Sequence, residues 1–161
     1  MRLACQQEDL NRGLAAVSRA IPARSTLPIT QHVLLEAADD GIVLSATDAE
    51  TIAITYRIKA TITEPGSITM PSRLLADFVS TLPHDEISMT LAERSRQVSL
   101  ACARNTASVG GMDPDDFPPI PVVSGGDSIV IPAARLRAGI AQTVFSAATD
   151  DSRPVLTGVH F

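Results

Sequence analysis

Short apolar runs alternate with a segment of helical periodicity over the first 60 residues of the chain. Leu10, Leu14, Val17 and Ile21 recur at the spacing of one helical face, which predicts a helix over 9–20. Further along, apolar and polar residues alternate, as in a strand with one buried face. The predicted strands of this part are 3–5, 33–37, 42–47 and 51–60. Their order predicts a β-α-β-β-β unit.

The same order of elements is repeated after the turn sequence Glu64-Pro65-Gly66. A helix is predicted over 71–82, since proline suits a first helical turn. The apolar side of this helix is expected to consist of Leu74, Leu75, Phe78 and Leu82. Strands are predicted at 67–70, 87–91, 98–102 and 106–109. Two such units predict an α+β domain. In it, the apolar face of each helix packs on a sheet.

Residues 110–127 are rich in proline, glycine and aspartate, a composition typical of an interdomain linker. We place a complete first domain at 1–120, a linker at 121–128 and the start of a second domain at 129–161. In the last segment the pattern predicts strands at 129–131 and 155–161 and a helix at 133–144. A shift of 126 residues aligns Leu10 with Leu136 and Gly13 with Gly139.

The last segment is therefore interpreted as a truncated second copy of the first domain. Its 33 residues are too few to bury an apolar core of their own. We expect it to expose its apolar side chains and the edge of an unfinished sheet. The side chains expected at its surface are Leu136, Ile140, Val144, Val155 and Phe161.

The amino-acid composition and net charge exclude several classes of protein. Hydrophobic residues make up 45% of the chain and charged residues 19%, as in globular proteins. The net charge of −5 excludes a uniformly basic nucleic-acid coat, and the single Tyr, four Phe and absent Trp disfavour base stacking. The sequence shows no apolar run long enough to span a membrane and no signal peptide, so a cytoplasmic protein is expected. Cys5 and Cys102 are expected to be reduced and buried.

Arginines occur on the polar sides of the predicted helices. Arg12 and Arg19 lie opposite the apolar stripe of the first helix, while Arg73 and Arg135 take similar places on the second and third. Arg24 follows in a loop after the first helix. Taken singly, each of these arginines fits a solvated helix face. In an acidic chain, their repetition indicates a local positive surface that contacts the phosphates of nucleic acid without reading sequence.

Catalytic chemistry has little support in the residues. The chain lacks the common nucleotide-binding, hydrolase and zinc motifs, so no cofactor and no metal are expected. Asp48-Ala49-Glu50 could supply the carboxylates of a metal-dependent nuclease, but apolar runs on both sides favour a hairpin turn. The alternatives to a DNA-binding protein are that nuclease, with Asp48 and Glu50 as ligands, and a generic α+β protein-interaction module.

Six segments spread over the whole chain keep a characteristic order. They are Arg24-Ser25-Thr26-Leu27-Pro28-Ile29, Thr47-Asp48-Ala49-Glu50, Met70-Pro71-Ser72-Arg73, Asp116-Phe117-Pro118, Phe145-Ser146, and Arg153 with Leu156-Thr157-Gly158. In this order, the sequence resembles the bacterial DNA polymerase III β subunit, the family of sliding clamps. The resemblance implies a DNA-clamp fold with helices on the DNA-facing side and sheets outside. It also implies a non-catalytic processivity factor that encircles duplex DNA.

The same resemblance implies partners and site residues. The partners are double-stranded DNA, the DNA polymerase III catalytic subunit, the clamp loader and a second copy that completes a homodimeric ring. Arg24 and Arg73 match DNA-contacting positions. The region of Arg104, Thr106 and Ala107 matches the dimer interface. Arg153 and Leu156 match the start of the groove that receives partner peptides.

Overall fold

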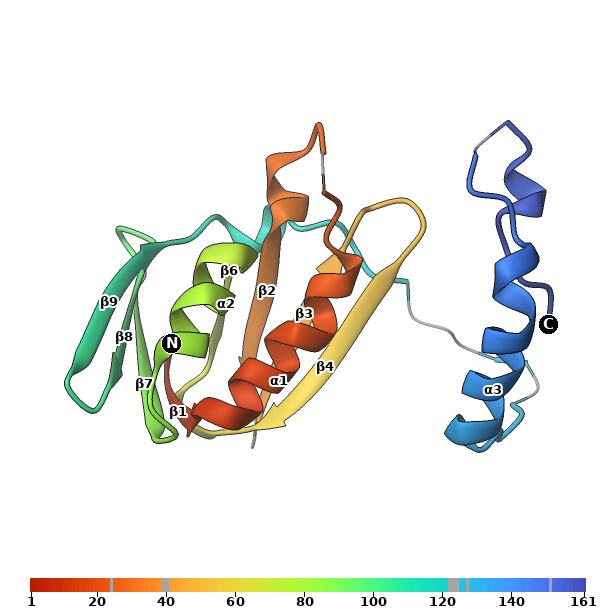
Figure 1. Cartoon of the computed structure of the whole chain (residues 1–161). Coiled ribbons are helices and arrows are strands. Elements are labelled where there is room, and N and C mark those ends of the chain that lie inside the picture. Colours follow the sequence, from red (N-terminus) through yellow and green to blue (C-terminus); the bar gives the residue numbers. More distant parts are fainter. Residues whose placement is uncertain (24, 39–40, 122–124, 127, 151) are drawn as a thin grey trace. The chain divides into compact units, whose positions relative to one another are not determined.

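The computed structural model describes residues 1–161 except 24, 39–40, 122–124, 127 and 151. The chain forms two compact units, Met1–Pro121 and Val122–Phe161 (Figure 1). In the described part of the chain, no helix is both long and apolar enough to cross a membrane.

The first repeat has the predicted order of elements. Its elements are β1 (Arg2–Gln6), α1 (Gln7–Val17), β2 (His32–Ala38), β3 (Gly41–Thr47) and β4 (Ala53–Lys59). Short 3-10 turns follow α1 at Ser18–Ala20 and precede β2 at Pro28–Gln31. In β4, Ile54 and Tyr56 are half-buried and Ile58 is buried, which confirms the one-sided strand pattern.

One strand that the sequence pattern did not predict, β5 (Thr61–Glu64), precedes the second repeat. The elements of the second repeat are β6 (Gly66–Pro71), α2 (Ser72–Thr81), β7 (Glu86–Ala92), β8 (Gln97–Cys102) and β9 (Asn105–Gly110). The additional strand is β5, which pairs antiparallel with β1 and extends the sheet by four residues at one edge. This strand contains a single apolar residue, Ile62, so the sequence shows no alternation of apolar and polar residues that would predict it.

The two repeats exchange their leading strands. One sheet has the order β5-β1-β7-β8-β9 and the other has the order β4-β3-β2-β6. Strand β1 therefore pairs with β7 of the second repeat, and β6 pairs with β2 of the first. All these pairings are antiparallel. Apart from β5 at the edge of the five-stranded sheet, each sheet combines three consecutive strands of one repeat with the first strand of the other, so the repeats form one interlocked domain.

Both helices cover the same side of these strands (Figure 1). Leu10, Leu14 and Val17 of α1 are fully buried, as the stripe predicted. Helix α1 packs on β3 and β4, and a Cβ atom at Gly13 would lie 2.7 Å from the side chain of Leu44. Glycine at this position lets the helix approach the sheet closely.

The buried side of α2 differs from the predicted one. Leu75 and Val79 are buried, but the side chain of Leu74 is 55% exposed, so its assignment to the core was wrong. Residues 75, 79 and 82 are spaced by four and three, which places them on the face that contacts β2 and β6. Leu74 lies about 100° away from Leu75 and points to the surface.

The cysteines are confirmed as buried free thiols. Cys5 and Cys102 are both almost inaccessible to solvent. Burial, helped by the charges of Asp9 and Glu86, raises the pKa of Cys5 to about 12. Thiols of this kind stay protonated and unreactive near neutral pH.

Residues 111–117 have the composition of a linker, but they pack on the strands within the first unit, inside the range 1–120 that we assign to the first domain. The N–H of Met112 donates to the carbonyl of Thr69 at 3.1 Å, and the N–H of Thr69 donates back to Met112 at 3.3 Å. Phe117 is buried, and Asp113 forms an ion pair with Arg96. This segment covers the β6 edge of its sheet, which composition alone does not reveal.

The second unit contains α3 (Ala133–Thr143) and 3-10 turns at Val144–Ser146 and Pro154–Leu156. None of its described residues is buried or belongs to a strand, so the strands predicted at 129–131 and 155–161 were wrong. A strand needs a second strand to pair with, and the described part of this unit contains none. The expected exposure is confirmed for Leu136, Val144, Val155 and Phe161, whereas Ile140 is half-buried.

Candidate nucleic-acid surface

The outward faces of α1 and α2 form the candidate surface of the first unit. The side-chain amide of Gln7, at the start of α1, donates to the carbonyl of Val79 near the end of α2 at 2.8 Å. The N–H of Gln7 donates to Asp85 just beyond α2. Because these contacts join the start of one helix to the end of the other, the helices run antiparallel.

The antiparallel arrangement brings predicted arginines to one surface. Arg12 lies midway along α1 and Arg19 in the 3-10 turn beyond it, while Arg73 lies in the first turn of α2. All three are exposed, and the side chain of Arg73 is 96% exposed. Arg73 and Arg19 lie toward the same end of the helix pair. The guanidinium groups are therefore available to a ligand that approaches the helices.

The helices also carry carboxylates that sequence reasoning missed. Arg12 forms an ion pair with Asp9 at 3.6 Å, and Arg73 forms one with Asp77 at 3.9 Å. The partners lie three and four residues apart, so the spacing could have revealed them. A third carboxylate is that of Glu8, whose Oε1 lies 2.9 Å from Nδ1 of His84.

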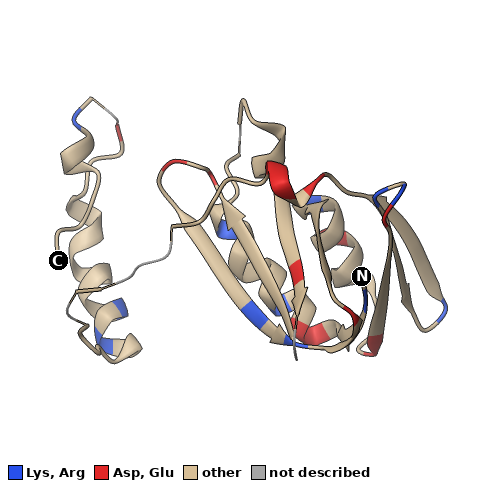
Figure 2. Ribbon diagram, turned by 180° about the vertical axis from the view of Figure 1, so that it is seen from behind, with Lys and Arg blue, Asp and Glu red and all other residues tan. Residues whose placement is uncertain are grey.

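Charge on this surface is balanced rather than positive. The helices and the 3-10 turn present three arginines and three carboxylates, namely Arg12, Arg19, Arg73, Glu8, Asp9 and Asp77. Basic and acidic segments are interspersed over the first unit in Figure 2. Exposed ion pairs are weak, so phosphates can compete for these arginines. The surface can hold a polyanion loosely but has little long-range attraction for it.

The remaining predicted DNA-contacting residues are Arg24 and Arg135. Arg24 is outside the described residues. The loop that follows it is held by Ser25, whose hydroxyl accepts hydrogen bonds from the N–H of Leu27 at 3.0 Å and the hydroxyl of Thr30 at 2.7 Å. Arg135 is exposed in the first turn of α3, in the second unit.

Residues predicted for the dimer interface lie on the hairpin of β8 and β9. Arg104 is in the turn, Thr106 is exposed on β9, and Ala107 is half-buried. Strand β9 is the last strand of its sheet. An edge strand presents unpaired backbone groups that can pair with another chain.

Residues predicted for the partner groove lie in the second unit. Arg153 and Leu156 are both exposed, and the N–H of Leu156 donates to the carbonyl of Arg153 at 2.9 Å. The two residues thus belong to one 3-10 turn. Their exposure leaves them accessible, and their role stays a prediction.

The acidic sequence around Asp48 forms a tightly bonded hairpin loop. One oxygen of Asp48 accepts the N–H groups of Glu50, Thr51 and Ile52 at 2.8–3.0 Å, and the other accepts the hydroxyl of Thr51. The N–H of Ile52, together with the Thr51 hydroxyl and further N–H groups, holds the pKa of Asp48 well below its usual range. This carboxylate organises the loop.

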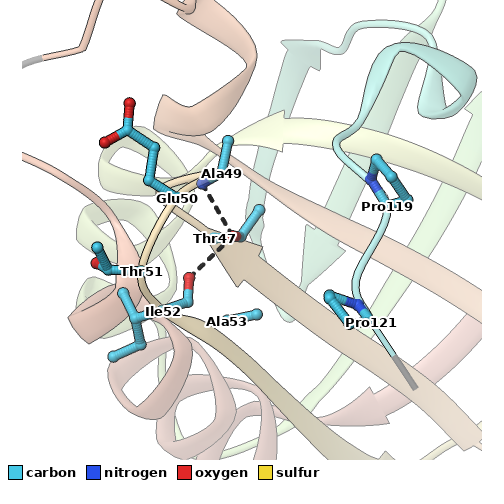
Figure 3. Close-up of a pocket in the computed structure, with 8 residues that line it drawn as sticks. All are labelled: Thr47, Ala49, Glu50, Thr51, Ile52, Ala53, Pro119 and Pro121. Atoms are coloured by element: carbon cyan, nitrogen blue, oxygen red, sulfur yellow. Dashed lines mark hydrogen bonds between the residues drawn. The ribbon is translucent and has the colours of Figure 1, made fainter. Parts of the chain in front are cut away.

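A pocket of about 210 Å³ lies beside this loop (Figure 3). The hydroxyl of Thr47 donates to Ile52 at 2.8 Å and accepts the N–H of Ala49 at 3.0 Å. The carboxylate of Glu50 points away from Pro119 and Pro121 on the opposite wall. Among the residues that the structure describes, no group of three ligating side chains could hold a metal ion. The hydrogen bonds that Asp48 accepts within the loop favour a structural turn over a nuclease site.

The profile of the family described as DNA polymerase III beta subunit, N-terminal domain, matches residues 1–121. The chain belongs to the DNA polymerase III β subunit family. Curated relatives named beta sliding clamp are 37% identical in Synechocystis sp. and 36% identical in Synechococcus elongatus, each over 99% of this chain.

The structure of this chain is also similar to solved structures of this family. The chain matches the DNA polymerase sliding clamp of Bacillus subtilis at 29% identity with a TM-score of 0.93, covering 99% of this chain and 43% of that one. The β subunit from DNA polymerase of Streptococcus pyogenes matches at 27% identity with a TM-score of 0.91, again over 99% and 43%. The predicted α+β clamp fold is thus confirmed. The chain spans 42% of the length of the Synechocystis relative and 43% of the Synechococcus one.

Proposed function

We propose that this chain acts as part of a sliding clamp, a replication factor that encircles duplex DNA and tethers the replicative polymerase without catalysing a reaction. The similarity to beta sliding clamps over 99% of the chain carries this proposal. In it, residues 1–120 are the first clamp domain, 121–128 the linker and 129–161 the start of a second domain. The cytoplasm is its proposed location.

The helix surface is the proposed DNA-facing side. Arg12, Arg19 and Arg73 lie exposed on the antiparallel helix pair, opposite the buried stripes that face the sheets. Arg24 and Arg135 are proposed to add phosphate contacts. A ring retains DNA by enclosing it, so weak contacts that read no sequence are sufficient and permit sliding.

The proposed protein partners use other surfaces. The exposed edge strand β9, with Arg104, Thr106 and Ala107, suits pairing with a second copy in a homodimeric ring. Arg153 and Leu156 are proposed to begin a groove for peptides of the polymerase III catalytic subunit and the clamp loader.

Duplex binding at several salt concentrations tests the DNA-facing surface. Each phosphate contact removed by an Arg→Ala substitution should reduce the slope of log affinity against log salt by about 0.9. We expect the fourfold variant of Arg12, Arg19, Arg24 and Arg73 to bind two duplexes of unrelated sequence equally weakly, as measured by fluorescence anisotropy. Arg94→Ala, in the exposed turn between β7 and β8, is the matched control and should leave the slope unchanged. An unchanged slope in the fourfold variant would contradict the proposal.

A further inference from the structure

Asp77 occupies a place on α2 that helix stability does not explain. Its carboxylate lies 3.9 Å from Nε of Arg73, one turn earlier, and both side chains are largely exposed. In this pair the cation precedes the anion, which is the less favourable order along a helix. Arg73 also lies in the first turn of α2, where the helix dipole disfavours a positive charge.

The pair on α1 provides a contrast. Asp9 precedes Arg12, and Asp9 and Glu8 both lie in the first helical turn, where negative charge is favourable. Helix stability therefore accounts for Asp9. It does not account for the orientation of Arg73 and Asp77.

We propose that Asp77 is a positioning residue for Arg73, which it holds along α2 and away from the DNA phosphates until they displace it. This inference rests on the proposed function. A carboxylate beside the guanidinium competes for its donors and also repels phosphate. Both effects weaken the contact that Arg73 makes, which favours a clamp that moves along DNA.

The expected consequence is a gain of affinity when the carboxylate is neutralised. Asp77→Asn should bind duplex DNA about twofold to threefold more tightly than the wild-type chain at low salt, since one exposed charge acts over a short range in water. The gain should shrink as salt is raised. Asp77→Glu preserves the charge and should restore the affinity of the wild-type chain.

Glu36→Gln is the matched control. Glu36 is exposed on β2, on the face opposite Val33, Leu35 and Ala37, which are buried in the core. Its neutralisation changes the net charge of the chain by the same amount but away from the helices. We expect no gain in duplex affinity from this variant.

A double-mutant cycle with Arg73→Ala decides between positioning and general repulsion. If Asp77 acts through Arg73, the gain from Asp77→Asn should be smaller in the Arg73→Ala background than in the wild-type chain. An undiminished gain in that background, no gain in the wild-type chain, or an equal gain from Glu36→Gln would each overturn the inference.

The experiment separates this inference from the proposed function. Weaker duplex binding by Arg73→Ala, with a smaller salt slope, supports the DNA-facing role of α2 whatever Asp77 does. If Arg73→Ala has no effect on duplex binding, Arg73 makes no DNA contact and Asp77 has nothing to position. Thermal melts of all variants should coincide closely, because the exchanged side chains are exposed.

Discussion

Helices α1 and α3 share a sequence pattern but not an environment. A shift of 126 residues aligns Leu10 with Leu136, Gly13 with Gly139 and Leu14 with Ile140. In α1 the apolar stripe is buried, and a Cβ atom at Gly13 would collide with Leu44. In α3 none of the residues is buried, and a Cβ atom at Gly139 would meet open space.

This difference shows that the apolar stripe is sufficient to predict a helix. Whether the stripe is buried depends on a sheet on which the helix can pack. Strands β3 and β4 supply the surface on which α1 packs. The described residues of the second unit contain no strand that could do the same for α3. Apolar periodicity alone therefore predicts the element correctly in both units and its burial in only one.

The largest expected difference between the units is in amide hydrogen exchange. Core amides of 1–110 should exchange only through unfolding of the domain, whereas those of 129–161 should exchange through local opening that costs almost no free energy. Hydrogen exchange followed by mass spectrometry measures both regions in one sample. Strong protection of 129–161 in a monomeric sample would show that this segment is packed.

Aligned core truncations should give the next largest difference. Leu14→Ala removes a fully buried side chain and should lower the free energy of unfolding of the first unit by about 2–5 kcal/mol. Ile140→Ala, at the aligned position of α3, should change it by less than about 0.5 kcal/mol. Urea denaturation followed by circular dichroism measures both. Comparable losses from the two variants would contradict the difference in packing.

The smallest expected effect is a pH dependence confined to the first unit. Burial lowers the pKa of His32 below 6.5, against the opposing effect of a hydrogen bond with the backbone of Thr69. The folded state therefore disfavours the charged imidazole. The stability contribution is fully present above pH 6.5 and is lost as the pH falls toward the folded pKa.

Thermal melts on both sides of that pH measure this contribution. The melting temperature of the wild-type chain should decrease more on acidification than that of His32→Asn. Equal decreases would show that His32 does not contribute to the pH dependence.

The sequence predicts helices and strands better than it predicts which of them pair or pack with one another. The stripe of α1 was correct because its spacing is set by one helix. The exchange of β1 and β6 was not predictable, because strand pairing depends on contacts between residues far apart in the chain. The docking of 111–117 was missed for a similar reason, since its hydrogen bonds reach back to Thr69.

The candidate surface was predicted in part. The exposure of Arg12, Arg19 and Arg73 follows from their angular distance to the apolar stripes. The ion pairs of Arg12 with Asp9 and of Arg73 with Asp77 were not predicted, although the spacing was visible in the sequence. The antiparallel arrangement of the helices could not be predicted, because it depends on the contacts of Gln7 with Val79 and Asp85.

The exchanged leading strands have a consequence for synthesis on the ribosome. Strand β1 emerges first, but its partner β7 ends at Ala92. At translation rates of about 5–20 residues per second, roughly 4 to 17 seconds pass before the two can pair. Before β7 is made, β1 can pair only with β5, whereas the sheet of β4, β3, β2 and β6 has all its strands once Pro71 has been added. The two sheets are therefore completed one after the other as the chain is made.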